Sequence, residues 1–170
     1  MGKTAQQAGK QFETMIEQAN QVYFLQDKAM IMKAEPTVKT FGNKKSGFNK
    51  SVYAKSNGLD YFGSLKGGRG VFFEAKQTAE VSFPLKQIKP NQVELFRAYE
   101  KLDTLAFLLV RFSKTGKMYL LPPKPLIEAW DGWTKYSNRA SIPLATFEAY
   151  GTEIAATNGC AVDWLDAIQQ

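Results

Sequence analysis

Apolar residues in the first part of the chain recur every three or four positions, which is the period of an amphipathic helix. Between residues 9 and 25 they are Phe12, Met15, Ile16, Ala19 and Tyr23. An apolar run over 29–33 predicts a short strand, whose continuation Pro36 limits. Residues 37–57 are polar, basic and contain glycine, which predicts an extended arm with some strand.

The middle of the chain predicts a strand pair, a helix and a buried strand. Residues 59–65 and 70–76 form the pair, because Lys66-Gly67-Gly68-Arg69 between them is a hairpin turn signal. Within 84–102 we expect a helix from about Pro90 to Leu102, since proline suits the first turn. Residues 104–112 are apolar from Leu105 to Val110 and predict a strand covered on both faces.

Smaller elements close the chain. We expect a strand at 118–121, a short helix around Leu126, Ile127 and Trp130, and elements near 143–150 and 161–169. The whole pattern predicts a mixed α/β fold, in which helices flank a central sheet. The length of 170 residues fits one domain. We expect a flexible N-terminus over 1–8, then a single domain over 9–170 with a basic insertion at about 37–57.

Composition excludes several kinds of site. The chain has no histidine, which excludes Ser-His-Asp and Cys-His catalysis and histidine-bound zinc or iron. Its single cysteine, Cys160, can form neither an internal disulfide nor a multi-thiolate metal site, and we expect it to be structural. A bound metal would have oxygen ligands, which favours magnesium or manganese. No apolar run approaches the ~20 residues that span a membrane, and the first residues contain no hydrophobic signal region, so we expect a cytoplasmic protein.

The net charge of +6 comes from one window of the sequence. Residues 39–76 contain eight basic and two acidic residues, and the rest of the chain is neutral. A solvated lysine-rich loop would explain this window, and so would a site for a polyanion. Interleaved aromatic residues (Phe41, Phe48, Tyr53, Tyr61 and Phe62) and several glycines favour nucleic acid, because they permit stacking and close approach to phosphates.

The two acids of the window are Asp60 and Glu74, and a lysine follows Glu74 by two residues. On a strand, Glu74 and Lys76 point to the same face, and Asp60 lies across the Gly-Gly turn. The alternative is an ordinary cross-strand ion pair on a solvated face. The apolar run Val71-Phe72-Phe73 indicates a buried strand instead, where charges need partners or a metal. Two carboxylates can hold a hard cation. The lysine can orient or deprotonate the attacking water, or balance charge on the phosphoryl transition state.

Several segments together resemble the RecU family of Holliday junction resolvases, which has the PD-(D/E)xK (restriction-endonuclease-like) nuclease fold. The resemblance covers about 9–168. It lies in Gly9–Asn20, Lys33-Ala34-Glu35-Pro36-Thr37, Gly58-Leu59-Asp60-Tyr61-Phe62-Gly63, Val71–Thr78, Ser82-Phe83-Pro84-Leu85, Asn91-Gln92, Phe107–Phe112 and Trp130-Asp131.

The resemblance implies a role for each matching residue. Asp60, Glu74 and the carbonyl of Ala75 would bind Mg²⁺, or Mn²⁺, and Lys76 would be the catalytic lysine. Glu13 matches a first-helix glutamate that supports the metal site, and Gln92 a helical glutamine facing the active site. Segment 37–57 would be a stalk that enters the open centre of a four-way junction. The chain would act as a homodimer that cuts symmetrically, and the DNA-binding residues would be Lys39, Lys44, Lys45, Lys50, Lys55, Lys66 and Arg69.

The sequence also departs from the family pattern. Phe72 stands where the family usually has an acidic residue, the hairpin after Asp60 is slightly longer, and the stalk is short and divergent. A nuclease with another DNA target, phage-encoded or for repair, stays open, as does a non-catalytic DNA-binding recombination accessory protein. Glu13 has a plain alternative as a solvated helix residue, and Gln92 as an ordinary one.

Overall fold

The computed structural model describes residues 2–35, 37–43, 48–54, 58–157 and 159–168. Six strands form one mixed sheet in the order β1-β4-β5-β7-β8-β10. In this sheet β5 and β7 are parallel, and the other neighbours are antiparallel. The sheet strands are β1 (Ala29–Lys33), β4 (Tyr61–Leu65), β5 (Gly70–Thr78), β7 (Leu105–Phe112), β8 (Met118–Leu121) and β10 (Thr152–Glu153).

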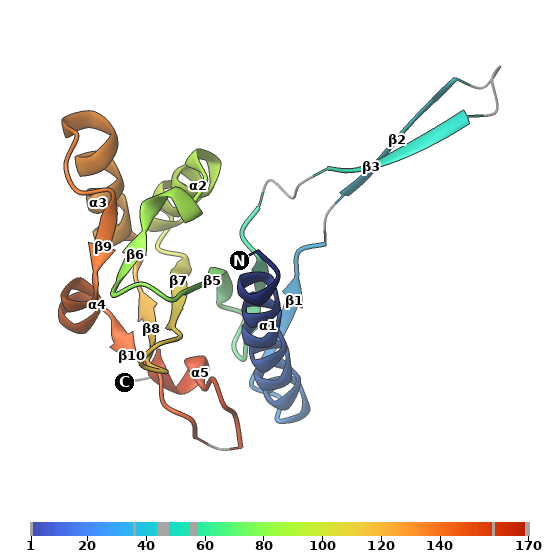
Figure 1. The fold of residues 1–170 in the computed structure, drawn as a ribbon. Coiled ribbons are helices and arrows are strands. Elements are labelled where there is room, and N and C mark those ends of the chain that lie inside the picture. Colours follow the sequence, from blue (N-terminus) through green and yellow to red (C-terminus); the bar gives the residue numbers. More distant parts are fainter. Residues whose placement is uncertain (1, 36, 44–47, 55–57, 158, 169–170) are drawn as a thin grey trace.

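Helices cover both faces of the sheet (Figure 1). Helix α1 (Gly2–Leu25) packs on one face, and α2 (Pro90–Lys101) and α3 (Pro123–Tyr136) pack on the other. The remaining elements are β6 (Ser82–Pro84), the 3₁₀ helix η1 (Leu85–Gln87), β9 (Ser141–Pro143), α4 (Leu144–Tyr150) and α5 (Trp164–Ala167). This arrangement confirms the mixed α/β prediction.

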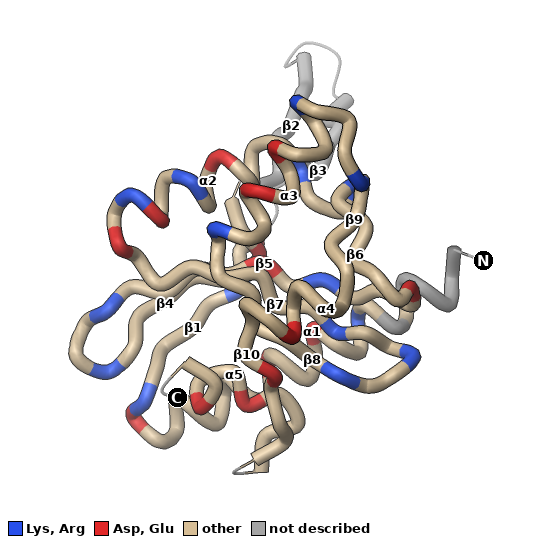
Figure 2. Tube along the Cα trace, turned by 90° about the vertical axis from the view of Figure 1, so that its left-hand side faces the viewer, with Lys and Arg blue, Asp and Glu red and all other residues tan. Residues whose placement is uncertain are grey.

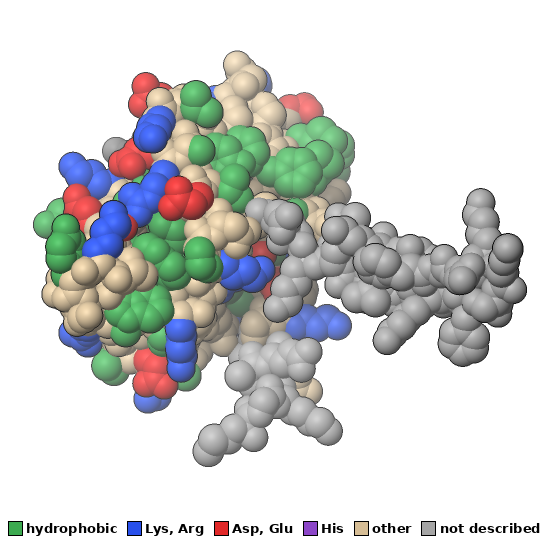
Figure 3. Space-filling model, turned by 90° about the horizontal axis from the view of Figure 1, so that it is seen from above, with side chains coloured by type: hydrophobic (Ala, Val, Ile, Leu, Met, Phe, Trp, Pro, Cys, Tyr) green, Lys and Arg blue, Asp and Glu red, His purple; other side chains and the backbone are tan. Residues whose placement is uncertain are grey.

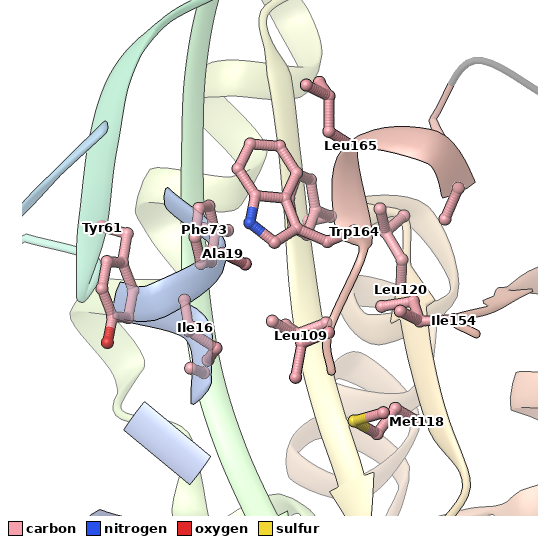
Figure 4. Packing of buried hydrophobic residues seen from close by; sticks show 14 of the residues in the cluster. Ile16, Ala19, Tyr61, Phe73, Leu109, Met118, Leu120, Ile154, Trp164 and Leu165 are labelled. Carbon is pink, nitrogen blue, oxygen red and sulfur yellow. The ribbon is translucent and has the colours of Figure 1, made fainter. Parts of the chain in front are cut away.

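The alternation of side chains along β5 divides the core into two layers. Val71, Phe73 and Ala75 point into the layer under α1, which Figure 4 shows from close by. Phe72 points to the layer under α2, where its ring stacks on Tyr99 with the centroids 4.3 Å apart. Glu74 and Lys76 follow Phe72 at intervals of two, so they lie on the α2 face.

Strands β2 (Thr37–Asn43) and β3 (Phe48–Ala54) pair antiparallel with each other, separately from the six-stranded sheet. Figure 1 shows these strands extending away from the sheet, after the end of β1. Within the predicted extended arm, the residues that the structure describes are therefore strand, and 44–47 and 55–57 lie outside the described residues.

The other predicted elements agree with the structure, with small shifts of their ends. The first helix begins at Gly2 rather than at residue 9, because residues 3–8 contain neither proline nor glycine to stop it. Flexibility of residues 1–8 stays a prediction, as does a single domain over 9–170. Among the described residues, no helix is both long and apolar enough to cross a membrane.

Candidate functional site

Asp60, Glu74 and Lys76 converge at one point, as the spacing predicts. The Lys76 ammonium contacts Oε1 of Glu74 and lies 3.4 Å from Oδ2 of Asp60. The Asp60 amide donates to Oε2 of Glu74 at 3.0 Å, and the Ala75 amide donates to Oδ2 of Asp60 at 3.2 Å. Glu74 is fully buried, whereas 40% of the Asp60 side chain is exposed. The cluster is therefore buried at Glu74 and open to solvent at Asp60.

Strand register explains why these residues meet. Tyr61 pairs with Phe73 in the β4–β5 hairpin, so Asp60, one residue earlier, lies opposite Glu74. Gly67 and Gly68 have φ angles of 92° and 89°, which make the turn that sets this register. The end of β1 holds Asp60 from the other side, because the Ala34 amide donates to its carbonyl at 2.8 Å.

Burial controls the ionisation of the cluster. Desolvation raises the pKa of Glu74 to about 7, although the Lys76 ammonium opposes this rise. Burial alone would lower the pKa of Lys76, but the neighbouring carboxylates of Glu74 and Asp60 outweigh it and raise the pKa. Near neutral pH the cluster thus contains a lysine that keeps its charge and a glutamate that can be either charged or neutral.

The raised pKa of Glu74 predicts a specific dependence of stability on pH. Folding raises this pKa from 4.5 to about 7, so the folded chain binds the proton more tightly between these values. The contribution of Glu74 to unfolding free energy should therefore fall as pH rises from about 4.5 to 7, by about 3 kcal/mol. Urea unfolding of the metal-free protein at pH 5 and pH 8 measures it. Glu74→Gln should remove this part of the pH dependence, and an unchanged dependence in that variant would contradict the prediction.

The residues present fit a hard divalent cation. Asp60 and Glu74 offer carboxylate oxygens, the ligands that Mg²⁺ and Mn²⁺ prefer. Ionising Glu74 in its buried position costs free energy, which a nearby cation would offset. Within the described residues no group of three or more acidic or cysteine side chains converges, so protein carboxylates alone would leave coordination positions open. The Ala75 amide contacts Asp60, whereas the role of the Ala75 carbonyl as a metal ligand stays a prediction.

The structure does not bring Glu13 into this cluster. Glu13 lies on α1, and Lys33 of β1 contacts both Glu13 and Glu17 at 2.8 Å. Lys33 pairs with Tyr61, whose side chain points into the α1 layer, so this ion pair lies on the opposite face from Lys76. Lys33 and its neighbour Ala34 connect α1 to the backbone of Asp60. Sequence analysis placed both residues in a segment that resembles the family, Lys33-Ala34-Glu35-Pro36-Thr37, but gave neither of them a role in the site.

Gln92 is 1% exposed, and its Oε1 accepts a hydrogen bond from the Lys89 amide at 3.0 Å. This bond closes the first turn of α2. Gln92 therefore has a structural partner, and its predicted role in the site remains untested.

The predicted DNA-binding residues fall into three groups. Lys66 and Arg69 are exposed in the turn between β4 and β5, at the other end of the hairpin from Asp60, where Figure 2 shows basic positions. Lys39 and Lys50 lie in β2 and β3, with side chains outside the described part. Lys44, Lys45 and Lys55 lie outside the described residues altogether.

The coloured surface in Figure 3 mixes basic, acidic and apolar side chains. Five of the described basic side chains have acidic partners within 4 Å, namely Lys33, Lys76, Arg97, Lys117 and Lys135. A basic surface for a polyanion has to come from the described cations outside these pairs and from the basic window of residues 39–76.

Comparisons with known proteins converge on one family. The model of the family described as "RecU: Recombination protein U" matches residues 7–170. A "Holliday junction resolvase RecU" from Ligilactobacillus salivarius is 34% identical over 152 residues, which cover 86% of this chain and 70% of the relative. Proteins of the same name from Shouchella clausii and Pediococcus pentosaceus are 32% and 28% identical, covering 92% and 95% of this chain and 77% and 84% of the relatives.

Proposed function

The chain belongs to the RecU family, and from this membership and the cluster of Asp60, Glu74 and Lys76 we propose that it is a metal-dependent endonuclease that resolves four-way DNA junctions. It acts in recombination and repair, in the cytoplasm where its substrate lies. The convergence of two carboxylates and a lysine at the end of a buried strand is the observation that carries this proposal. A non-catalytic DNA-binding accessory protein would not need a buried, ionisable glutamate beside a lysine.

In this proposal Asp60 and Glu74 would hold Mg²⁺, or Mn²⁺, and the Ala75 carbonyl would be a third ligand. When bound, the ion supplies a Lewis acid that polarises the scissile phosphate and lowers the pKa of a water molecule. The open side of the cluster, next to the exposed Asp60 oxygen, admits the phosphate. Glu13 supports the site through Lys33, and Gln92 supports it from the first turn of α2.

Lys76 orients the attacking water and stabilises the negative charge that develops on the phosphate oxygens. The water oxygen forms a bond to phosphorus while the bond to the 3′ oxygen breaks, which leaves a 5′-phosphate and a 3′-hydroxyl. Hydrogen bonds from the Ala34 and Ala75 amides fix Asp60 before substrate arrives.

Paired symmetric cuts need two active sites, and each chain supplies one set of Asp60, Glu74 and Lys76. We therefore propose a homodimer, with one site for each of two opposed strands. The β2–β3 hairpin enters the open centre of the junction. Basic residues of the hairpin, together with Lys66 and Arg69, bind phosphates of the arms, so binding weakens as salt rises.

Cleavage of a labelled four-way junction tests the function. With Mg²⁺ the purified chain should nick two opposed strands of the junction and leave a linear duplex of the same sequence uncut. A protein that binds the junction but never cuts it, with Mg²⁺ or Mn²⁺, would be an accessory protein. Equal cutting of junction and duplex would indicate a nuclease with another DNA target.

A further inference from the structure

The start of α2 lies at the same end of the sheet as Lys76. Helix α2 connects the parallel strands β5 and β7, so it runs back against the direction of β5. Tyr99 of α2 stacks on Phe72 of β5 and fixes their relative height. Gln92 precedes Tyr99 by two helical turns, about 10 Å, and Lys76 follows Phe72 by about 13 Å of strand. The first turn of α2 is therefore level with the cluster.

The segment that leads into this turn exposes two lysines. Leu85 and Ile88 are buried at 0% and 2% exposure, and Lys86 and Lys89, each one residue later, are exposed. The shared spacing places both lysines on the outer side of the segment. No acidic residue occurs from 81 to 93, and neither lysine has an acidic partner within 4 Å among the described residues.

The backbone under these lysines is fixed. The Leu85 amide donates to the Ala140 carbonyl at 3.0 Å, and the Ile88 amide donates to the Leu85 carbonyl at 2.9 Å. The Gln92 side chain holds the Lys89 amide, and Pro90 begins the helix. Two cations without acidic partners thus stand on a fixed segment of backbone at the level of the two carboxylates.

We infer that Lys86 and Lys89 bind phosphates of the cleaved strand next to the scissile phosphate. This inference rests on the proposed nuclease function. A strand that reaches Lys76 has to pass the start of α2, and phosphates there need cations that are not already paired. Lys66 and Arg69 cannot supply them, because their turn lies at the other end of the β4–β5 hairpin. The β2–β3 hairpin, whose sequence diverges from the family, therefore does not have to supply all of the phosphate contacts near the scissile phosphate.

The test replaces both lysines in the full chain and measures how junction binding depends on salt, with Ca²⁺ in place of Mg²⁺. Each lost phosphate contact should reduce the slope of log K against log salt by about 0.9. We expect the Lys86→Gln/Lys89→Gln variant to lose close to two such contacts and to bind about tenfold more weakly at low salt. The matched control is Lys28→Gln/Lys101→Gln, which removes the same charge from exposed positions at the start of β1 and the end of α2.

A second measurement locates the contacts on the DNA. Neutral methylphosphonates on either side of the scissile phosphate should weaken binding of the parent and of the control, but hardly that of Lys86→Gln/Lys89→Gln. Equal salt slopes and equal methylphosphonate effects in the parent and that variant would overturn the inference while leaving cleavage by the parent intact. A parent that never binds or cuts DNA would instead overturn the proposed function.

Discussion

Asp60→Asn and Lys76→Ala should each abolish junction cleavage while largely preserving junction binding. Asp60→Asn removes the charge of one proposed metal ligand but keeps its shape, and Lys76→Ala removes the cation that contacts both carboxylates. Loss of one such electrostatic contribution to a transition state costs about 10²–10³ in rate, and loss of a metal ligand should cost more. Single-turnover cleavage of a labelled four-way junction measures the rate, and a gel-shift assay with Ca²⁺ measures binding.

Lys101→Ala is the matched control, since this lysine is exposed at the end of α2 and far from the cluster. It should cut at the parental rate. A readout besides activity separates loss of metal from loss of fold: Mg²⁺ should raise the melting temperature of the parent and of Lys101→Ala but not that of Asp60→Asn. If Asp60→Asn and Lys76→Ala still cut like the parent, the active site lies elsewhere.

Local sequence patterns predicted the geometry of this cluster because its residues are close in the chain. The alternation along 70–76 placed Glu74 and Lys76 on one face, and the Gly-Gly turn brought Asp60 opposite them. The mixed α/β fold was predictable for the same reason, since each strand and helix has its own period. The catalytic roles of these residues remain predictions.

Contacts between distant segments were not predictable in this way. The Lys33 ion pairs with Glu13 and Glu17 join residues 16–20 positions apart, on the opposite face of the sheet from Lys76. The periodicity of a single sequence indicates which face of a helix is apolar. It does not indicate which strand the polar residues of that helix contact. The buried Tyr61 hydroxyl shows the same limit: among the described buried side chains it has no hydrogen-bond partner, and no pattern in the sequence marks it.

Trp164 is a further long-range contact, and its loss should have the largest effect on stability. Its side chain is fully buried, and its Nε1 donates to Oδ1 of Asn20 on α1 at 3.0 Å. Its ring centroid lies 5.3 Å from that of Tyr23. It lies 5.2 Å from that of Phe73, the residue before Glu74 (Figure 4). A helix of four residues, α5, thus joins α1 to the strand that carries the cluster.

Trp164→Ala should lower the free energy of unfolding by about 3–5 kcal/mol, because it leaves a cavity and removes the hydrogen bond that Oδ1 of Asn20 accepts. Urea unfolding measures the loss, and Trp133→Ala, a partly buried tryptophan on α3, should lose less. Trp164 lies in the core layer under α1, whereas Glu74 and Lys76 lie on the α2 face of β5. Cleavage should therefore fall only with the folded fraction, and below the melting temperature the rate per folded molecule should stay near that of the parent. A stable Trp164→Ala variant with a much lower rate would show instead that Trp164 positions Glu74 through Phe73.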